Sequence, residues 1–147
     1  YWAVHDPRRH CAVRRQSPPC SSNTCMTEPL YRPHILAHAR NPQHRGVILD
    51  ATHRADEANP ACGDRCSVTS KVENDVIIEA RFEGVGCALS TAATSILLEE
   101  MTGKPVADLV QLTDDVFLSL LGVDVTSGRL DCALFGLRTL RRALCLN

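Results

Sequence analysis

The chain has 147 residues, enough for one domain with a substantial apolar core. Its net charge of −1 and aromatic content of 4% argue against nucleic acid as a partner, because such binding relies on cationic and stacking side chains. No apolar run approaches the roughly 18 residues that a membrane span requires. We therefore expect a soluble protein with neither nucleic acid nor a membrane as its partner.

The eight cysteines are more than a domain of this size normally carries. No apolar segment of the secretory type follows a basic start, so nothing indicates an oxidising compartment. In a reducing compartment, thiols at particular spacings are more often metal ligands or reactive groups than disulfides. We expect a cytoplasmic location, with an organelle matrix as the alternative.

Residues 1–26 differ in composition from the rest of the chain. Residues 1–25 contain four arginines and one acidic residue, with Pro, Ser and Cys scattered among them and no periodicity. We predict a disordered extension over residues 1–26, with a transit peptide or a metal-binding segment as alternatives. Met26 directly precedes the first segment with an ordered pattern and is a candidate natural start. Residues 27–147 are predicted to form one domain.

The first half of that domain contains a helix and a hairpin. Residues 28–40 form an amphipathic pattern that Asn41-Pro42 ends. Residues 66–73 and 76–82 alternate apolar and polar side chains, and Asn74-Asp75 separates them, which predicts two antiparallel strands.

The second half is helical. Residues 88–101 predict a helix, and two short helices are expected from Pro105 and from Thr113. The last helix is expected over about residues 128–145, with one apolar stripe formed by Ala133, Leu137, Leu140 and Leu144. Strands followed by helices predict an α+β fold, in which helices pack on one face of a small antiparallel β-sheet.

Three cysteines fall at junctions between these elements. Cys62 precedes the first hairpin strand, Cys87 lies between the second strand and a helix, and Cys132 lies near the start of the last helix. A helix N-terminus favours an anionic thiolate at Cys87. Taken singly, each cysteine is more often a small buried residue, but a helix packed on a sheet can bring three such junctions together.

Asp64 adds a carboxylate beside the first of these cysteines, and Gly63 permits a tight turn between them. Three thiolates and one carboxylate suffice for tetrahedral zinc or for one edge of an iron–sulfur cluster. The spacing alone does not choose between these sites.

Four segments resemble a known family. They are "LYRPHILAHARNPQHRG" (30–46), "NPACGD" (59–64), "FEGVGCALSTAATSILLEEMTGK" (82–104) and "RLDCALFGLRTLRRAL" (129–144). Over residues 29–145 the chain resembles the IscU/SufU/NifU-N-terminal family of iron–sulfur cluster assembly scaffold proteins. The resemblance implies a SufE/NifU-like fold and makes residues 27–147 an iron–sulfur cluster scaffold domain.

The resemblance also implies that Cys62, Asp64, Cys87 and Cys132 are the ligands of a transient [2Fe–2S] cluster. In the family, a cysteine desulfurase supplies sulfur as a persulfide, for which Cys62 and Cys132 are the candidate acceptors here. Iron and electrons come from donor partners, and the cluster then passes to acceptor apoproteins. Such a protein is a scaffold and carrier rather than an enzyme. Because a carboxylate is a harder and weaker ligand than a thiolate, Asp64 should make the cluster labile.

A zinc-dependent sulfurtransferase, as in the SufU branch, is the alternative. There Zn²⁺ holds the same four side chains, and one cysteine relays persulfide sulfur from the desulfurase. A purely structural zinc domain fits less well, because structural sites are usually closed by four Cys or His ligands.

Branch-specific positions give mixed signals. Asp131 stands where the IscU branch has histidine and the SufU branch usually lysine, while Arg129 matches the SufU-like R-x-x-C pattern. The segment between Lys104 and Cys132 is short, as in IscU, and lacks the motif that IscU proteins offer to their chaperone. We expect Asp131 to be a solvated surface acid, with an alternative ligand as the rival interpretation. Cys66 occupies an inward strand position and is expected in the core, with a spare sulfur ligand as its alternative.

Overall fold

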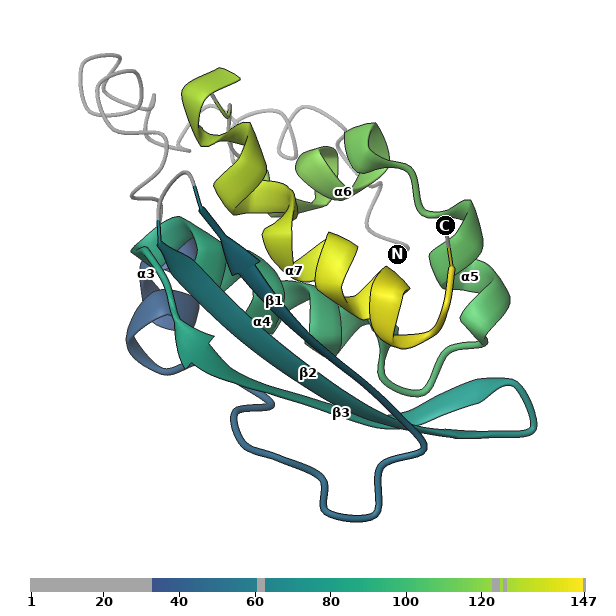
Figure 1. Ribbon diagram of the computed structural model, residues 1–147. Coiled ribbons are helices and arrows are strands. Elements are labelled where there is room, and N and C mark those ends of the chain that lie inside the picture. Colours follow the sequence, from purple (N-terminus) through teal and green to yellow (C-terminus); the bar gives the residue numbers. More distant parts are fainter. Residues whose placement is uncertain (1–32, 61–62, 123–124, 126, 147) are drawn as a thin grey trace, which may run out of the picture.

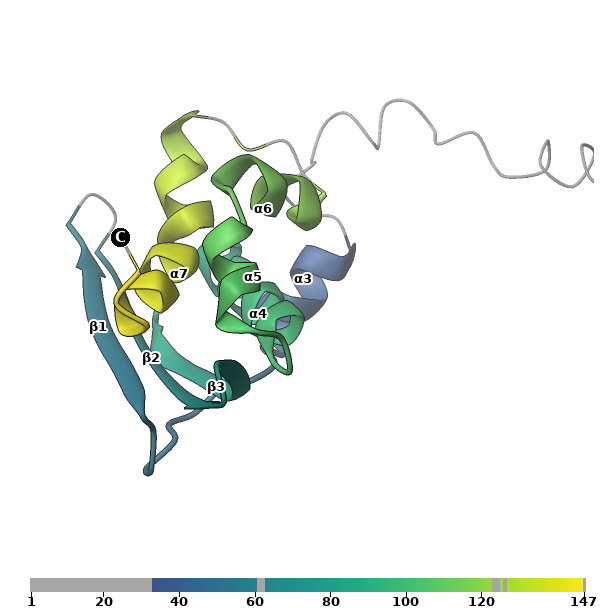
Figure 2. The same cartoon turned by 90° about the vertical axis from the view of Figure 1, so that its right-hand side faces the viewer.

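The computed structural model describes residues 33–60, 63–122, 125 and 127–146. Within them, β1 (His53–Asn59), β2 (Asp64–Glu73) and β3 (Val76–Val85) form an antiparallel sheet in the order β1-β2-β3. Figures 1 and 2 show the helices gathered on one face of this sheet. The α+β class and the one-sided packing of the helices are therefore confirmed. The predicted extension over residues 1–26 lies outside the described residues and stays a prediction.

The predicted hairpin is present, and both of its strands are longer than expected. β2 begins two residues earlier, at Asp64, and β3 continues three residues further, to Val85. Asn74 and Asp75 form the turn with positive φ angles of 51° and 61°, a conformation that Asn and Asp tolerate better than most residues. The longer strands bring Asp64 and Val85 to the same end of the sheet.

β1 is a strand that the sequence pattern does not predict. Its residues, HRADEAN, offer only two alanines as apolar side chains, so no apolar alternation marks the strand. β1 is an edge strand that pairs with β2 from His53↔Ser70 to Asn59↔Asp64. Its inward-facing Glu57 forms an ion pair with Arg142 at 2.9 Å. Charged side chains suit such an edge because they oppose pairing with another chain.

The other edge of the sheet is covered by the segment that follows the first helix. Phe82 N donates to His44 O and Gly46 N donates to Phe82 O, both at 2.9 Å. The chain then crosses the outer face of the sheet (Figure 1), where the buried Ile48 donates its N–H to Thr69 Oγ1 at 3.0 Å. This segment ties the end of the first helix to β3.

Five α-helices complete the described fold. They are α3 (Pro33–Arg40), α4 (Ala88–Met101), α5 (Val106–Gln111), α6 (Asp114–Leu121) and α7 (Leu130–Ala143), the last preceded by a 3₁₀ turn, Ser127–Arg129. α4 has the predicted bounds, and the other helices agree with their predictions within the described residues. Residues 28–32 of the first predicted helix lie outside them. No helix of the described part is long and apolar enough to cross a bilayer.

The core lies between the sheet and the pair α4 and α7. The predicted stripe on α7 is buried, as are Cys66, Val68 and Phe82 on the inner face of the sheet. α4 and α7 approach closely at Gly136, where an added Cβ would lie 2.2 Å from Thr94 Oγ1. The two helices therefore pack together and present their N-terminal ends near the start of β2.

Candidate metal centre

Three side chains converge where β2, α4 and α7 begin. Asp64 is the first residue of β2, Cys87 is the N-cap of α4, and Cys132 lies in the first turn of α7. One ligand atom from each of the three lies within 4.8 Å of the others. Among the described residues this is the one group of three or more Cys, His, Asp and Glu side chains close enough to share a metal ion. Three of the four predicted site residues thus come together.

Cys87 owes its position to the end of the helix that it caps. Its backbone is extended, with φ −67° and ψ 168°, and its Sγ accepts the N–H of Ser90 at 3.4 Å. This is the bond that Ser, Thr or Asp makes at an N-cap, made here by sulfur. This hydrogen bond from Ser90 was not predicted. The sequence does place Ser90 three residues after Cys87, the spacing at which an N-cap side chain accepts a backbone N–H. The bond directs the half-buried thiol toward the other two side chains.

Asp64 carries the most informative atom of the site. The residue is 5% exposed, and its Oδ2 has no hydrogen-bond partner among the described residues. A buried carboxylate oxygen without a partner costs free energy unless a cation or donor satisfies it. A carboxylate with an unpartnered oxygen, close to two cysteine sulfurs, is a donor set that fits zinc or iron.

Gly86 allows the chain to pass beside this carboxylate. A Cβ at that position would lie 3.5 Å from Asp64 Cγ and Oδ2, and 2.4 Å from Ser90 Oγ. A side chain there would contact Asp64 at ordinary van der Waals distance and would force the Ser90 hydroxyl to move. Glycine before Cys87 therefore leaves room for both side chains at the site.

Cys132 is buried, whereas its neighbour on the chain is not. The cysteine is 8% exposed and belongs to the core that α7 forms with the sheet. The Asp131 side chain is 60% exposed and forms an ion pair with Arg138 at 2.9 Å. Asp131 is thus an exposed acid, as expected, and it does not join the three converging side chains.

Cys62 lies outside the described residues, so its membership of the site stays a prediction. The chain on either side of it is closed by a hydrogen bond from Gly63 N to Asn59 O at 2.8 Å. Gly63 adopts φ +74°, a conformation that favours glycine, in agreement with the tight turn predicted before Asp64.

Cys66 belongs to the core. It is 5% exposed, and burial raises the pKa of its thiol to about 11, although a hydrogen bond with Thr139 acts in the opposite direction. A thiol with this pKa stays protonated at neutral pH and is a poor ligand and a poor nucleophile. The predicted core position is confirmed.

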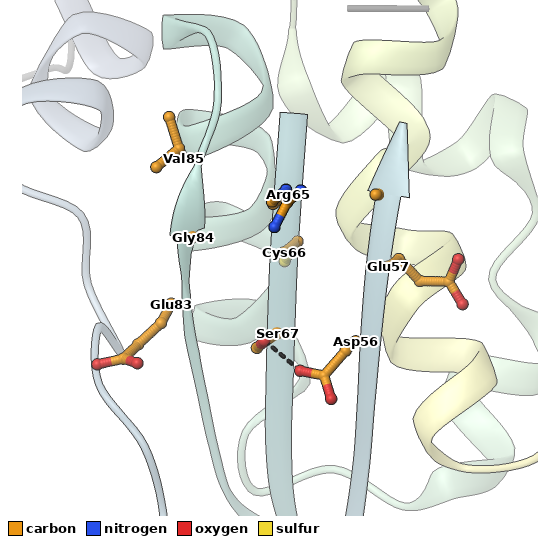
Figure 3. A pocket seen from close by; sticks show the side chains of 9 residues that line it. Asp56, Glu57, Arg65, Cys66, Ser67, Glu83, Gly84 and Val85 are labelled. Carbon is orange, nitrogen blue, oxygen red and sulfur yellow. Dashed lines mark hydrogen bonds between the residues drawn. The ribbon is translucent and has the colours of Figure 1, made fainter. Parts of the chain in front are cut away.

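The outer face of the sheet carries a hollow of about 540 Å³ near the same end (Figure 3). Asp56, Arg65, Ser67 and Glu83 line it, and the Ser67 hydroxyl donates to Asp56. Side chains alternate between the two faces of a strand, so Arg65 lies outside while Asp64 and Cys66 face the helices. The hollow is therefore separate from the converging thiols.

Comparisons with known proteins identify the family of this chain. The family model of the NifU-like N-terminal domain matches residues 30–146. The chain belongs to this family. The family resemblance inferred from the four motifs is thereby confirmed.

Two relatives differ in the roles that their names state. The zinc-dependent sulfurtransferase SufU of Bacillus subtilis is 32% identical over 132 residues, covering 78% of this chain and 89% of the relative. The iron–sulfur cluster assembly scaffold protein IscU of Aquifex aeolicus is 39% identical over 117 residues, covering 78% and 73%. The family therefore includes both scaffolds and a sulfurtransferase.

Solved structures share the fold. A candidate iron–sulfur cluster assembly scaffold protein for the SUF system, from Fervidobacterium islandicum, superposes with a TM-score of 0.69 at 24% identity, covering 80% of this chain and 98% of that one. The N-terminal part of a NifU-like protein from Brucella abortus gives a TM-score of 0.69 at 17% identity, covering 80% and 94%. At these identities the likeness supports the fold.

Proposed function

We propose that this protein is a scaffold on which a labile [2Fe–2S] cluster is assembled and from which the cluster passes to acceptor apoproteins. The proposed ligands are Cys62, Asp64, Cys87 and Cys132, with Cys62 and Cys132 as candidate acceptors of persulfide sulfur. Two observations on Asp64 carry the proposal: one of its carboxylate oxygens lies within 4.8 Å of two cysteine sulfurs, and its buried Oδ2 has no hydrogen-bond partner among the described residues.

The chemistry of these donors suits temporary binding. Thiolates are soft ligands that favour iron–sulfur clusters, whereas a carboxylate is a harder and weaker ligand for the same iron. Of the four proposed bonds to the cluster, the one from the Asp64 carboxylate is the weakest, so we expect it to break first. Asp64 is therefore the residue that favours release, and the cysteines are the residues that favour retention.

The proposal implies partners that carry each component. A cysteine desulfurase supplies the sulfur, and donor partners supply iron and electrons. Apo iron–sulfur proteins accept the finished cluster. The proposed location is the cytoplasm, where thiols stay reduced.

A zinc-dependent sulfurtransferase is the second candidate. It is supported by the similarity to the Bacillus subtilis SufU, whose name states that activity. The same four side chains would hold Zn²⁺, and the ion would keep the thiols deprotonated. In that case one cysteine relays sulfur from the desulfurase, and the protein is an enzyme rather than a carrier.

Anaerobic purification with metal analysis tests the proposal, followed by reconstitution with iron, cysteine and a cysteine desulfurase. We expect a visible sulfur-to-iron charge-transfer spectrum and transfer of the cluster to an apo-ferredoxin. Cys87→Ser should abolish the spectrum, and Cys66→Ala, a control at a core thiol, should retain it. Tight stoichiometric zinc, no cluster and stimulation of the desulfurase would instead favour the sulfurtransferase.

The role of Asp64 is tested by its Asp64→Ala variant in the same assay. Removal of the weak ligand should leave a more persistent cluster and slow its transfer to the apo-ferredoxin. Faster loss of the cluster than in the wild type would contradict this role.

A further inference from the structure

The link that delivers Cys87 to the site contains Gly84, Val85 and Gly86. An added Cβ at Gly84, where φ is +149°, would lie 2.0 Å from Arg65 O, and one at Gly86 would lie 2.4 Å from Ser90 Oγ. The packing thus requires glycine at position 84, whereas at position 86 the Cβ would displace only a serine hydroxyl. Glycine also has the most conformational freedom to lose on folding. A contact from outside the link would therefore help to keep it, and Cys87 after it, in one position.

Side-chain packing does not supply that contact on the solvent side. Val85 is 75% exposed, and a hollow of about 410 Å³ borders the link, lined in part by Arg40, Arg45 and Thr91. Toward the inside, the strand pairs with β2 as far as Arg65↔Val85. One edge of the link is therefore bonded and the other faces the hollow.

Arg45 bonds to this second edge. Phe82 uses its N–H and C=O there for His44 and Gly46, and Gly84, two residues further, presents its carbonyl on the same side. The backbone of residues 44–46 does not extend that far. Instead, Arg45 Nη2 donates to Gly84 O at 2.9 Å. The side chain thus continues the ladder by one bond beyond the last backbone pair.

The guanidinium group is itself held in place. Its Cζ lies 5.6 Å from the centroid of the Phe82 ring, within the range of a cation–π contact. The backbone around it is fixed by the two bonds to Phe82, by Gln43 N donating to Ser95 Oγ at 2.7 Å, and by Arg81 Nη1 donating to Arg45 O at 3.3 Å. A donor that is already ordered loses little entropy when it bonds.

We propose that Arg45 is a positioning residue for Cys87: its bond to Gly84 O fixes the glycine link and thereby places the thiol at the start of α4. Arg45 does not contact the proposed cargo and is not a catalytic residue. The inference rests on the proposed function only in taking Cys87 as a ligand. The fixing of the link itself is a property of the protein without metal.

The test compares Arg45→Met and Arg45→Lys with Arg141→Met, which also removes an arginine that donates to a backbone carbonyl, Leu112 O, but contacts neither Arg45 nor Gly84. In metal-free protein, Arg45→Met should raise amide hydrogen exchange in the link and at Cys87 about tenfold, the effect of losing one charge-assisted hydrogen bond. Arg45→Lys, which keeps a cationic donor, should retain most of the protection. Arg141→Met should leave exchange in the link unchanged.

Titration with Co²⁺ alone supplies the second readout, through thiolate-to-cobalt charge-transfer absorption. Arg45→Met should weaken Co²⁺ binding about tenfold, with recovery in Arg45→Lys and no change in Arg141→Met. A merely structural role would lower the urea midpoint without changing exchange in the link or the Co²⁺ affinity of folded protein. Arg45→Gln replaces Arg45→Met if the latter does not fold.

The inference is overturned if either readout for Arg45→Met equals that of Arg141→Met. Because hydrogen exchange uses no metal, its outcome is independent of the reconstitution experiment. A wild type that assembles no cluster but shows the expected exchange and Co²⁺ effects would refute the proposed function and leave the positioning role intact.

Discussion

The two ends of the sheet differ in how far their polar groups are paired by hydrogen bonds. At the hairpin end, the turn is bonded to the connection between α4 and α5: Ile77 N donates to Lys104 O at 2.9 Å, Gly103 N to Ile77 O at 2.7 Å, and Val106 N to Asp75 O at 2.8 Å. At the opposite end, Asp64 Oδ2 is buried without a partner among the described residues. One end has its backbone groups satisfied, and the other keeps a polar atom open for a ligand.

This difference indicates that the hairpin end contributes to the stability of the domain and that the end with the candidate metal centre lowers it. Paired backbone groups stabilise the hairpin end, whereas an unpaired buried carboxylate and a glycine link make the site end costly in the metal-free protein. Functional sites commonly carry such a cost, which the rest of the fold offsets. The comparison can be tested by matched changes at the two ends.

The largest difference is expected from alanine at one glycine of each end. In Gly84→Ala the new Cβ would lie 2.0 Å from Arg65 O, so the backbone of β2 or β3 must move, and we expect a loss of about 3 kcal/mol or more. Gly103 has φ +88° with nothing within 4 Å of its Cβ, so Gly103→Ala should cost only about 1 kcal/mol. Urea unfolding of metal-free protein measures both, and equal losses would contradict the proposed contrast.

The next effect concerns a thiol close to the site end that is not part of the site. Burial raises the pKa of Cys66 to about 11 from an ordinary value of 9.0. Between these values the unfolded chain has released the proton and the folded chain keeps it, so stability falls as pH rises. The loss by pH 11 should approach about 2–3 kcal/mol.

Urea unfolding at pH 8 and pH 10.5 checks this prediction, with Cys66→Ala as the comparison. The variant starts less stable because a buried group is removed, but its stability should decline less between the two pH values. Parallel declines in the two proteins would show that another group causes the alkaline loss.

The smallest effect is expected from neutralising one carboxylate at each end. Asp64→Asn replaces a buried charge that lacks a partner on Oδ2 and should stabilise the metal-free protein at pH 7 by about 1 kcal/mol. Asp75→Asn, in the turn at φ 61°, should change stability by less than about 0.5 kcal/mol because Asn tolerates the same conformation. Chemical denaturation of both variants measures these changes in the free energy of unfolding. Destabilisation by Asp64→Asn would mean that the carboxylate already has a favourable partner.

Sequence periodicity predicted the elements whose burial has a period. α4, α7 and the hairpin all have apolar side chains at helical or strand spacing, and Cys66 was placed in the core by alternation alone. β1 was missed because an edge strand can be built from charged residues that leave no such period. Hydrophobic patterns report which side chains are buried, and β1 buries few.

The candidate site was likewise predicted only in part, because local motifs identify its ligands but not the contacts that depend on tertiary structure. Motifs at element junctions identified Asp64, Cys87 and Cys132, which the fold brings within 4.8 Å, whereas the position of Cys62 stays a prediction. The bond from Arg45 to Gly84 joins residues 39 positions apart. Such a contact depends on tertiary structure, and no local pattern in the chain indicates it.

The close approach of α4 and α7 has a consequence for what a metal ion would join. An added Cβ at Gly136 would lie 2.2 Å from Thr94 Oγ1, so the two helices that carry Cys87 and Cys132 leave no room between them for a larger side chain at this point. Asp64 comes from β2 and therefore from the sheet layer. An ion held by all three side chains would act as a cross-link between the helix layer and the sheet layer of the domain.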